Sequence, residues 1–121
     1  MADRPFIAVI PIVLTANGEG SGEYDVGQGN VLRIERILQK SEGSADIIDM
    51  SDSFGNKYGN MSSDKPLDVS YFTDIASDNN NPANLPNPIV IENNGKLQFR
   101  LKDTSGAGNT VYLYLHGFLS Q

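Results

Sequence analysis

A regular alternation of apolar and ring side chains runs through "NTVYLYLHGF", residues 109–118. Val111, Leu113 and Leu115 recur at every second position, and this period is typical of a strand with one face in a core. The opposite face of the strand carries four ring side chains: Tyr112, Tyr114, His116 and Phe118. A strand face that meets water is normally polar, so these rings raise the question of what they contact.

The preceding apolar stretch shows the same period. In "KLQFRLK", residues 96–102, Leu97, Phe99 and Leu101 alternate with charged and polar residues. The dipeptide Asn94-Gly95 comes directly before it and supplies the two positive φ angles of a type I′ turn. We therefore predict a β-hairpin over "IVIENNGKLQFRL", residues 89–101.

The rest of the chain also favours short strands. Further strands are predicted over four segments: 6–15, around 24–26, 45–50 and 67–73. The segment "VLRIERILQKSE", residues 31–42, fits a helix or a strand; the flanking glycines and the β-branched residues favour a strand, with a helix as the alternative. Residues 77–88 are rich in Asn and Pro, which favour a loop.

Seven to nine short strands without a crossover helix predict an all-β fold, an antiparallel β-sandwich or a small barrel. A chain of 121 residues indicates one domain, residues 1–121. Its N-terminal part, about residues 2–16, reads as an extended arm or edge strand because Pro11 interrupts a central ladder. The apolar run there is too short to cross a bilayer, and we interpret it as structure, not as a targeting signal.

Net charge and cysteine content limit the classes of partner and site that the protein can have. The net charge is −6, with 15 acidic and 9 basic residues, which argues against a nucleic-acid groove and against a membrane surface. The chain contains no cysteine, which excludes disulfides and thiolate metal sites.

No motif indicates catalysis or a cofactor. The single histidine, His116, has no nearby serine and carboxylate in a recognisable pattern. The aspartates lie in or beside polar turns, where they favour turn formation over acid–base work: Asp46, Asp49, Asp52, Asp74 and Asp78. Residues 49–60 and 77–84 offer oxygen ligands for calcium but lack the EF-hand spacing. The glycines of residues 18–30 lack the helix and lysine of a phosphate-binding loop. We expect a protein that is not an enzyme, with no cofactor and no metal.

Three interpretations of the ring face remain open. The rings form a second core face, or an inter-subunit contact in which Tyr and Phe are enriched, or a surface that stacks on sugars.

The order of elements resembles a known family. Three segments carry the resemblance: "VLRIERILQKSEGSADIIDMSDSFGNKYGN" (31–60), "NLPNPIVIENNGKLQFRL" (84–101) and the closing strand "NTVYLYLHGF" (109–118). In this order they are similar to single jelly-roll virion proteins of bacteriophages, which are capsid decoration (cement) proteins and vertex-type minor capsid proteins. The resemblance implies a jelly-roll sandwich, a homo-oligomer that contacts the major capsid protein, and a place on the capsid surface after synthesis in the host cytoplasm.

We therefore expect a structural virion component that decorates or stabilises a capsid. The expected contact residues are Phe6, Ile7 and Val9 in the arm and Tyr112, Tyr114, His116 and Phe118 in the last strand. The alternative is a carbohydrate- or receptor-binding module, in which Tyr58, Tyr71 and the loop 77–88 hold a glycan.

Overall fold

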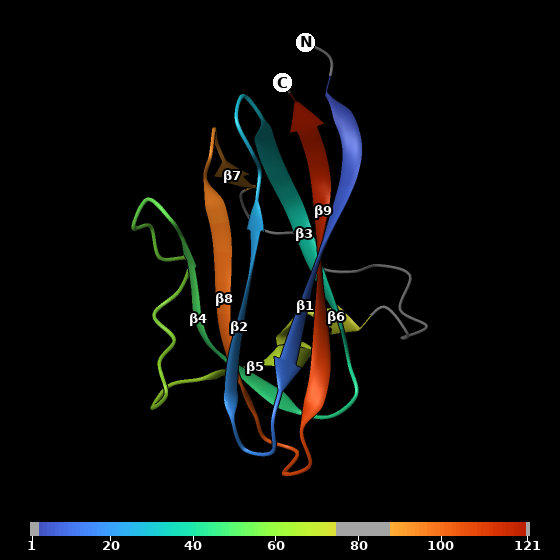
Figure 1. Ribbon diagram of the computed structural model, residues 1–121, viewed down its shortest axis with the longest axis vertical. Coiled ribbons are helices and arrows are strands. Elements are labelled where there is room, and N and C mark those ends of the chain that lie inside the picture. The colour runs from blue at the N-terminus through green and yellow to red at the C-terminus, as the bar shows by residue number, and fades with distance from the viewer. Residues whose placement is uncertain (1–2, 75–87, 121) are drawn as a thin grey trace.

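The computed structural model describes residues 3–74 and 88–120, which form nine strands in two facing sheets (Figure 1). The strands are β1 Arg4–Leu14, β2 Glu19–Asp25, β3 Val31–Ser41, β4 Ala45–Asp52, β5 Leu67–Asp68, β6 Thr73–Asp74, β7 Ile89–Ile91, β8 Lys96–Asp103 and β9 Asn109–Ser120. A single 3₁₀ turn, η1 Val69–Tyr71, stands between β5 and β6. Within these residues no helix is long and apolar enough to cross a membrane.

The strand order is that of a jelly roll. Sheet A has the order β1-β9-β3-β6, with β7 also paired to β3, and sheet B has the order β2-β8-β4-β5. The pairs are nested along the chain: β1 with β9, β2 with β8, β3 with β7, and β4 with β5. All pairings are antiparallel except the short one between β3 and β6. The predicted all-β, jelly-roll-like sandwich of seven to nine strands is confirmed.

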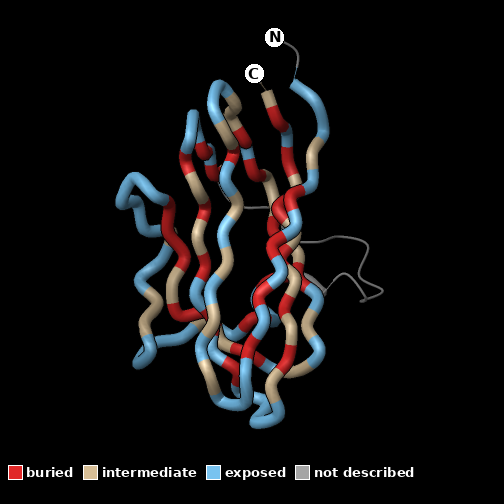
Figure 2. The backbone as a smooth tube through the Cα atoms, in the orientation of Figure 1, coloured by how far each residue is buried: buried red, intermediate tan, exposed pale blue. Residues whose placement is uncertain are grey.

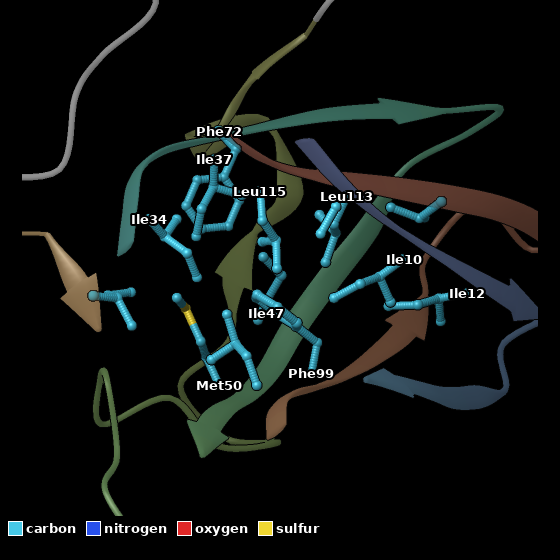
Figure 3. Packing of buried hydrophobic residues seen from close by; sticks show 14 of the residues in the cluster. Ile10, Ile12, Ile34, Ile37, Ile47, Met50, Phe72, Phe99, Leu113 and Leu115 are labelled. Atoms are coloured by element: carbon cyan, nitrogen blue, oxygen red, sulfur yellow. The ribbon is translucent and has the colours of Figure 1, made fainter. Parts of the chain in front are cut away.

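The core lies between the two sheets and is built by the two-residue period. Buried and exposed residues alternate along β1 and β8, and Figure 2 shows this alternation along the backbone. The inward side chains of both sheets interdigitate in one cluster (Figure 3). Ile10, Leu113 and Leu115 come from sheet A, and Ile47 and Phe99 come from sheet B. All five are almost completely buried.

Of the predicted segment 31–42, residues Val31–Ser41 fold as a strand, β3, as favoured over the helix. A β-bulge interrupts its pairing with β9 between Ile34 and Arg36. Gly117 lies opposite the bulge, where a Cβ atom would overlap the carbonyl oxygen of Arg33. The bulge matters because it re-aims the side chains beside it.

The predicted hairpin at Asn94-Gly95 is wrong. β7 belongs to sheet A and β8 to sheet B, so the turn joins the two layers and the strands beside it do not pair with each other. Only Asn94 has a positive φ, 61°, and the Gly95 N–H donates to the Glu92 carbonyl at 2.7 Å. A type I′ turn needs a positive φ at both residues, so the turn is of another kind. Gly95 is required for space, since a Cβ atom would lie 2.8 Å from Ile91 and from Phe54.

The predicted strand over 67–73 is also broken. The chain leaves sheet B after β5, makes the turn η1 and enters sheet A at β6. The Ser70 N–H donates to the Asp68 carboxylate at 2.9 Å, which starts the turn. Val69 and Phe72 are buried by it, so packing between the layers outweighs the local preference for a strand. The predicted loop 77–88 lies, except for Pro88, outside the described residues.

The N-terminal segment does not extend away from the domain. Residues 4–14 form β1, which pairs with β9 along its whole length, from Arg4↔Leu119 to Leu14↔Asn109. Of the two predicted possibilities, arm or edge strand, β1 is an edge strand of sheet A.

Candidate functional site

The two outer faces of the sandwich differ in chemistry. On the outer face of sheet B, acidic and basic side chains alternate and form exposed ion pairs. Lys96 lies 3.3 Å from Glu23, and Arg100 lies 3.5 Å from Glu19. Such pairs contribute little to stability, but they give sheet B an ordinary water-facing surface.

Over β1 and β9 the outer face of sheet A is mostly apolar, and the charged residues Arg33, Arg36 and Lys40 of β3 border it. The exposed fraction is 57% for Ile7, 72% for Val13 and 38% for Phe118, which is high for large hydrophobic side chains. We call this surface the apolar face; its residues are Pro5, Ile7, Val9, Pro11 and Val13 of β1, Leu38 of β3, Val90 of β7, and Tyr112, Tyr114, His116 and Phe118 of β9. A contiguous patch of this kind marks an interaction site more often than a solvated surface.

The strand register assembles this face into rows. Ile7 pairs with His116, and His116 pairs on its other side with Arg36 of β3. In the next row, Tyr114 lies between Val9 and Leu38. Side chains of paired residues on one face have Cβ atoms roughly 5 Å apart, so each row is a continuous contact.

One of the predicted contact residues does not join this face. Phe6 points to the other side of β1, where its partly buried ring lies 6.0 Å from that of Tyr24. Successive residues of a strand point to opposite faces, so Phe6 cannot share a surface with Ile7 and Val9. The structure brings the other predicted residues together: Ile7, Val9, Tyr112, Tyr114, His116 and Phe118.

Several residues of the apolar face were missed from the sequence. Pro5 and Val13 share the odd-numbered parity of Ile7 and Val9, and that parity could have revealed them. Leu38 and Val90 could not be found in this way, because their place depends on the bulge of β3 and on the pairing of β7 with β3.

The open edge of β1 is poorly suited to pairing with a further strand. The Glu42 N–H donates to the Thr110 carbonyl at 3.4 Å, so the even-numbered residues of β9 bond to β3 and the odd-numbered ones bond to β1. In β1 the backbone N–H and C=O groups of the even-numbered residues therefore point to β9. Those of the odd-numbered residues point to the open edge. Pro5 and Pro11 are odd-numbered and have no N–H, which interrupts the donor row of that edge. A partner is therefore better accommodated on the apolar face than on this edge.

Two hollows open on the apolar face, on either side of His116. One of about 140 Å³ is lined by Pro5, Glu35, Arg36, His116, Gly117 and Phe118. The other, of about 170 Å³, is lined by Ile7, Leu38, Tyr114 and His116. The first hollow lies at the β-bulge and carries charge, whereas the second is bounded mostly by apolar side chains.

Buried carboxylates outside this face organise loops. Asp103 accepts hydrogen bonds from the Ser105 hydroxyl at 2.6 Å, the Asn109 amide at 2.6 Å and the Asn17 N–H at 2.9 Å. The Ser105 hydroxyl and the backbone N–H groups around it hold the pKa of Asp103 well below its ordinary value, although burial opposes the shift. The carboxylate fixes the loop between β8 and β9.

The aspartates of β4 have a similar structural role. Burial alone would raise the pKa of Asp52, but hydrogen bonds from Tyr58 and Asn56 lower it. The pKa of Asp49 is also lowered against burial, by hydrogen bonds from Lys57 and Ser51. These carboxylates use their oxygens within their own loop. Among residues 3–74 and 88–120, no three Asp, Glu or His side chains gather as a metal site.

The two tyrosines predicted to bind a glycan, Tyr58 and Tyr71, differ in their exposure. The half-buried Tyr58 donates its hydroxyl to Asp52 at 2.6 Å and packs against the core. Burial and the Asp52 carboxylate raise the pKa of this hydroxyl far above its ordinary value. Tyr71 is 68% exposed and its ring meets Phe72 edge-on, with centroids 5.6 Å apart.

Comparison with known proteins gave no match to a family model, to a curated protein or to a solved structure.

Proposed function

We propose that this protein is a non-catalytic structural component of a bacteriophage virion, which binds the capsid shell through its apolar face. The observation that carries the proposal is the contrast between the two outer faces: sheet B presents ion pairs to water, and sheet A presents exposed apolar and aromatic side chains. Aromatic side chains are enriched at the buried centres of protein interfaces.

The fold and the sequence resemblance support the choice of a virion. The jelly-roll strand order agrees with the fold that the resemblance to decoration and vertex-type proteins implies. The nested pairing also brings β1 and β9, the first and last strands, side by side (Figure 1). Their outward residues make up most of the apolar face, so these two strands would build the docking surface.

Charge indicates the kind of partner surface. Along β3, beside the apolar centre, lie Arg33, Arg36 and Lys40, paired in register with Phe118, His116 and Tyr112. A shell surface with apolar residues and surrounding carboxylates would complement this face. Copies of the chain bound at neighbouring lattice positions would form a homo-oligomer on the capsid. They would stabilise the shell by mass action, because they bind only its assembled form.

The test is co-sedimentation with particles. Virions purified from the phage that encodes the chain are analysed for the protein, and purified protein is then added to their empty shells. We expect the wild type to sediment with the shells. Tyr114→Lys should bind at least about tenfold more weakly, because it places a charge at the centre of the face. Gln98→Lys, on the outer face of sheet B, is the matched control and should bind normally.

The proposal fails if purified virions lack the protein, or if folded Tyr114→Lys binds the shells as well as the wild type does. Binding to a glycan array that depends on Tyr71 would instead support the carbohydrate-binding alternative.

A further inference from the structure

The hollow at the β-bulge is lined by a half-buried cationic side chain, Arg36, that has one nitrogen without a partner. The Nε atom of Arg36 is buried, and no residue in the described part of the chain accepts its hydrogen bond. A buried donor without an acceptor costs free energy, so such a group in a native protein calls for an explanation. Arg36 lines the hollow together with His116 and Phe118, so the accessible part of its guanidinium group is where an incoming acceptor would bind.

The acidic residue that lines this hollow is paired with another arginine. Glu35 lines the same hollow, but its carboxylate lies 3.7 Å from the Nε of Arg33. Within residues 3–74 and 88–120, none of the ion pairs includes Arg36. An incoming carboxylate could accept from the Arg36 guanidinium, and pairs of this kind are strong because both groups are charged.

The second hollow lies one row further along the sheet. Ile7, Leu38 and Tyr114 line it and His116 separates it from the first hollow, so it suits an apolar side chain. Neighbouring rows on one face of a sheet are two residues apart, about 7 Å. An extended partner segment has the same spacing between its residues i and i+2.

We propose that the apolar face binds an extended segment of a partner protein in which an apolar residue and an acidic residue are separated by one residue. The carboxylate occupies the hollow beside Arg36, and the apolar side chain occupies the hollow between Ile7, Leu38 and Tyr114. This inference rests on the proposed function, since it describes the partner of the same face. It makes Arg36 the residue that selects the partner by charge.

The probe is a pair of acetylated, amidated peptides, Ser-Leu-Ser-Glu-Ser and Ser-Leu-Ser-Gln-Ser, titrated into the ¹⁵N-labelled full chain. With the Glu peptide we expect amide shifts confined to β1, to β3 around the bulge and to β9. The Gln peptide should bind roughly tenfold more weakly, because it lacks the charge that strengthens the hydrogen bond to Arg36. Arg36→Gln should bind both peptides equally. Arg100→Gln, an arginine on the outer face of sheet B, should keep the preference for Glu.

Equal binding of the two peptides to the wild type, shifts centred on sheet B, or no shifts at millimolar peptide would each overturn the inference. Arg36→Gln must keep the dispersed amide spectrum of a folded chain. Arg36→Lys is a second variant that retains the charge, so it should still prefer the Glu peptide, and equal binding of both peptides to folded Arg36→Lys would count against selection by charge. Shell co-sedimentation is scored separately. If the wild type binds shells but not peptides, this inference fails and the proposed function stands. If it binds the Glu peptide but not shells, the virion proposal fails and the site for an acidic segment stands.

Discussion

At the scale of single residues, Gly117 determines how β9 meets β3. It lies opposite the bulge, between His116 and Phe118 of the apolar face, and is itself buried. The backbone of Arg33 approaches it so closely that no side chain fits between them. The positions of Arg36 and His116 at the charged hollow therefore depend on Gly117, a residue without a side chain.

We expect Gly117→Ala to destabilise the protein by about 1–3 kcal/mol, the range for overpacking a close contact. The new Cβ atom would overlap the Arg33 carbonyl oxygen, and that backbone can move only by disturbing the β3–β9 pairing. The free energy of unfolding in urea measures the effect. A variant as stable as the wild type would show that the strands are further apart at the bulge than the structure indicates.

At the scale of elements, β8 shows how one strand serves two environments. Phe99 is almost fully buried in the core between the sheets, and the next residue, Arg100, is exposed beside Glu19. Figure 3 shows Phe99 among the core side chains of both sheets. The two residues are adjacent in sequence, so their difference in burial tests the register of the strand.

Phe99→Ala should lower the free energy of unfolding by about 3–5 kcal/mol, because it leaves a cavity in the core. Arg100→Ala is the matched control, and we expect a change of about 1 kcal/mol or less, since its ion pair is exposed. Both values come from chemical denaturation at pH 7. Similar losses for the two variants would contradict the assigned faces of β8.

At the scale of the whole molecule, four aspartates whose pKa values change on folding link stability to pH. The pKa values of Asp49, Asp52 and Asp103 are lowered by folding, whereas burial and the nearby Asp68 raise the pKa of Asp46. A lowered pKa stabilises the fold above the unfolded value, about 3.9 for aspartate, and this stabilisation is lost as the pH falls further. Asp46 acts in the opposite direction, so the three lowered groups should dominate in acid.

We expect the urea midpoint to fall progressively below about pH 4, where aspartates of the unfolded chain take up protons. Asp103→Asn should be less stable than the wild type at pH 7, because it removes the charge that several donors surround. The difference between the two proteins should shrink from pH 5 to pH 3. Asp64→Asn, at an exposed position, is the control and should follow the wild type at both values. A constant difference for Asp103→Asn would show that its ionisation is not linked to folding.

The local pattern of the chain was sufficient for the fold class and for most of the candidate site. Alternation in residues 96–102 and 109–118 depends only on the period of a strand, so it identified inward and outward residues before any partner strand was known. The same parity in β1 would have placed Phe6 in the interior. Phe6 was predicted as a contact residue because it is apolar, without regard to its even-numbered position in the strand.

Only the tertiary structure decided which strands share a sheet. Asn94-Gly95 indicates a turn. The residues of the turn do not indicate whether the next strand stays in the same sheet or crosses to the other one. That choice depends on the burial of Ile89 and Ile91 beside β3 and on the space around Gly95. The apolar face likewise needs β1, β9 and β3, which are far apart in the chain, to lie side by side. Along the regular strands, the sequence by itself determined which side chains turn outward, because that is a local property of the backbone. The β3 bulge and long-range packing determined the outward residues of β3 and which side chains meet.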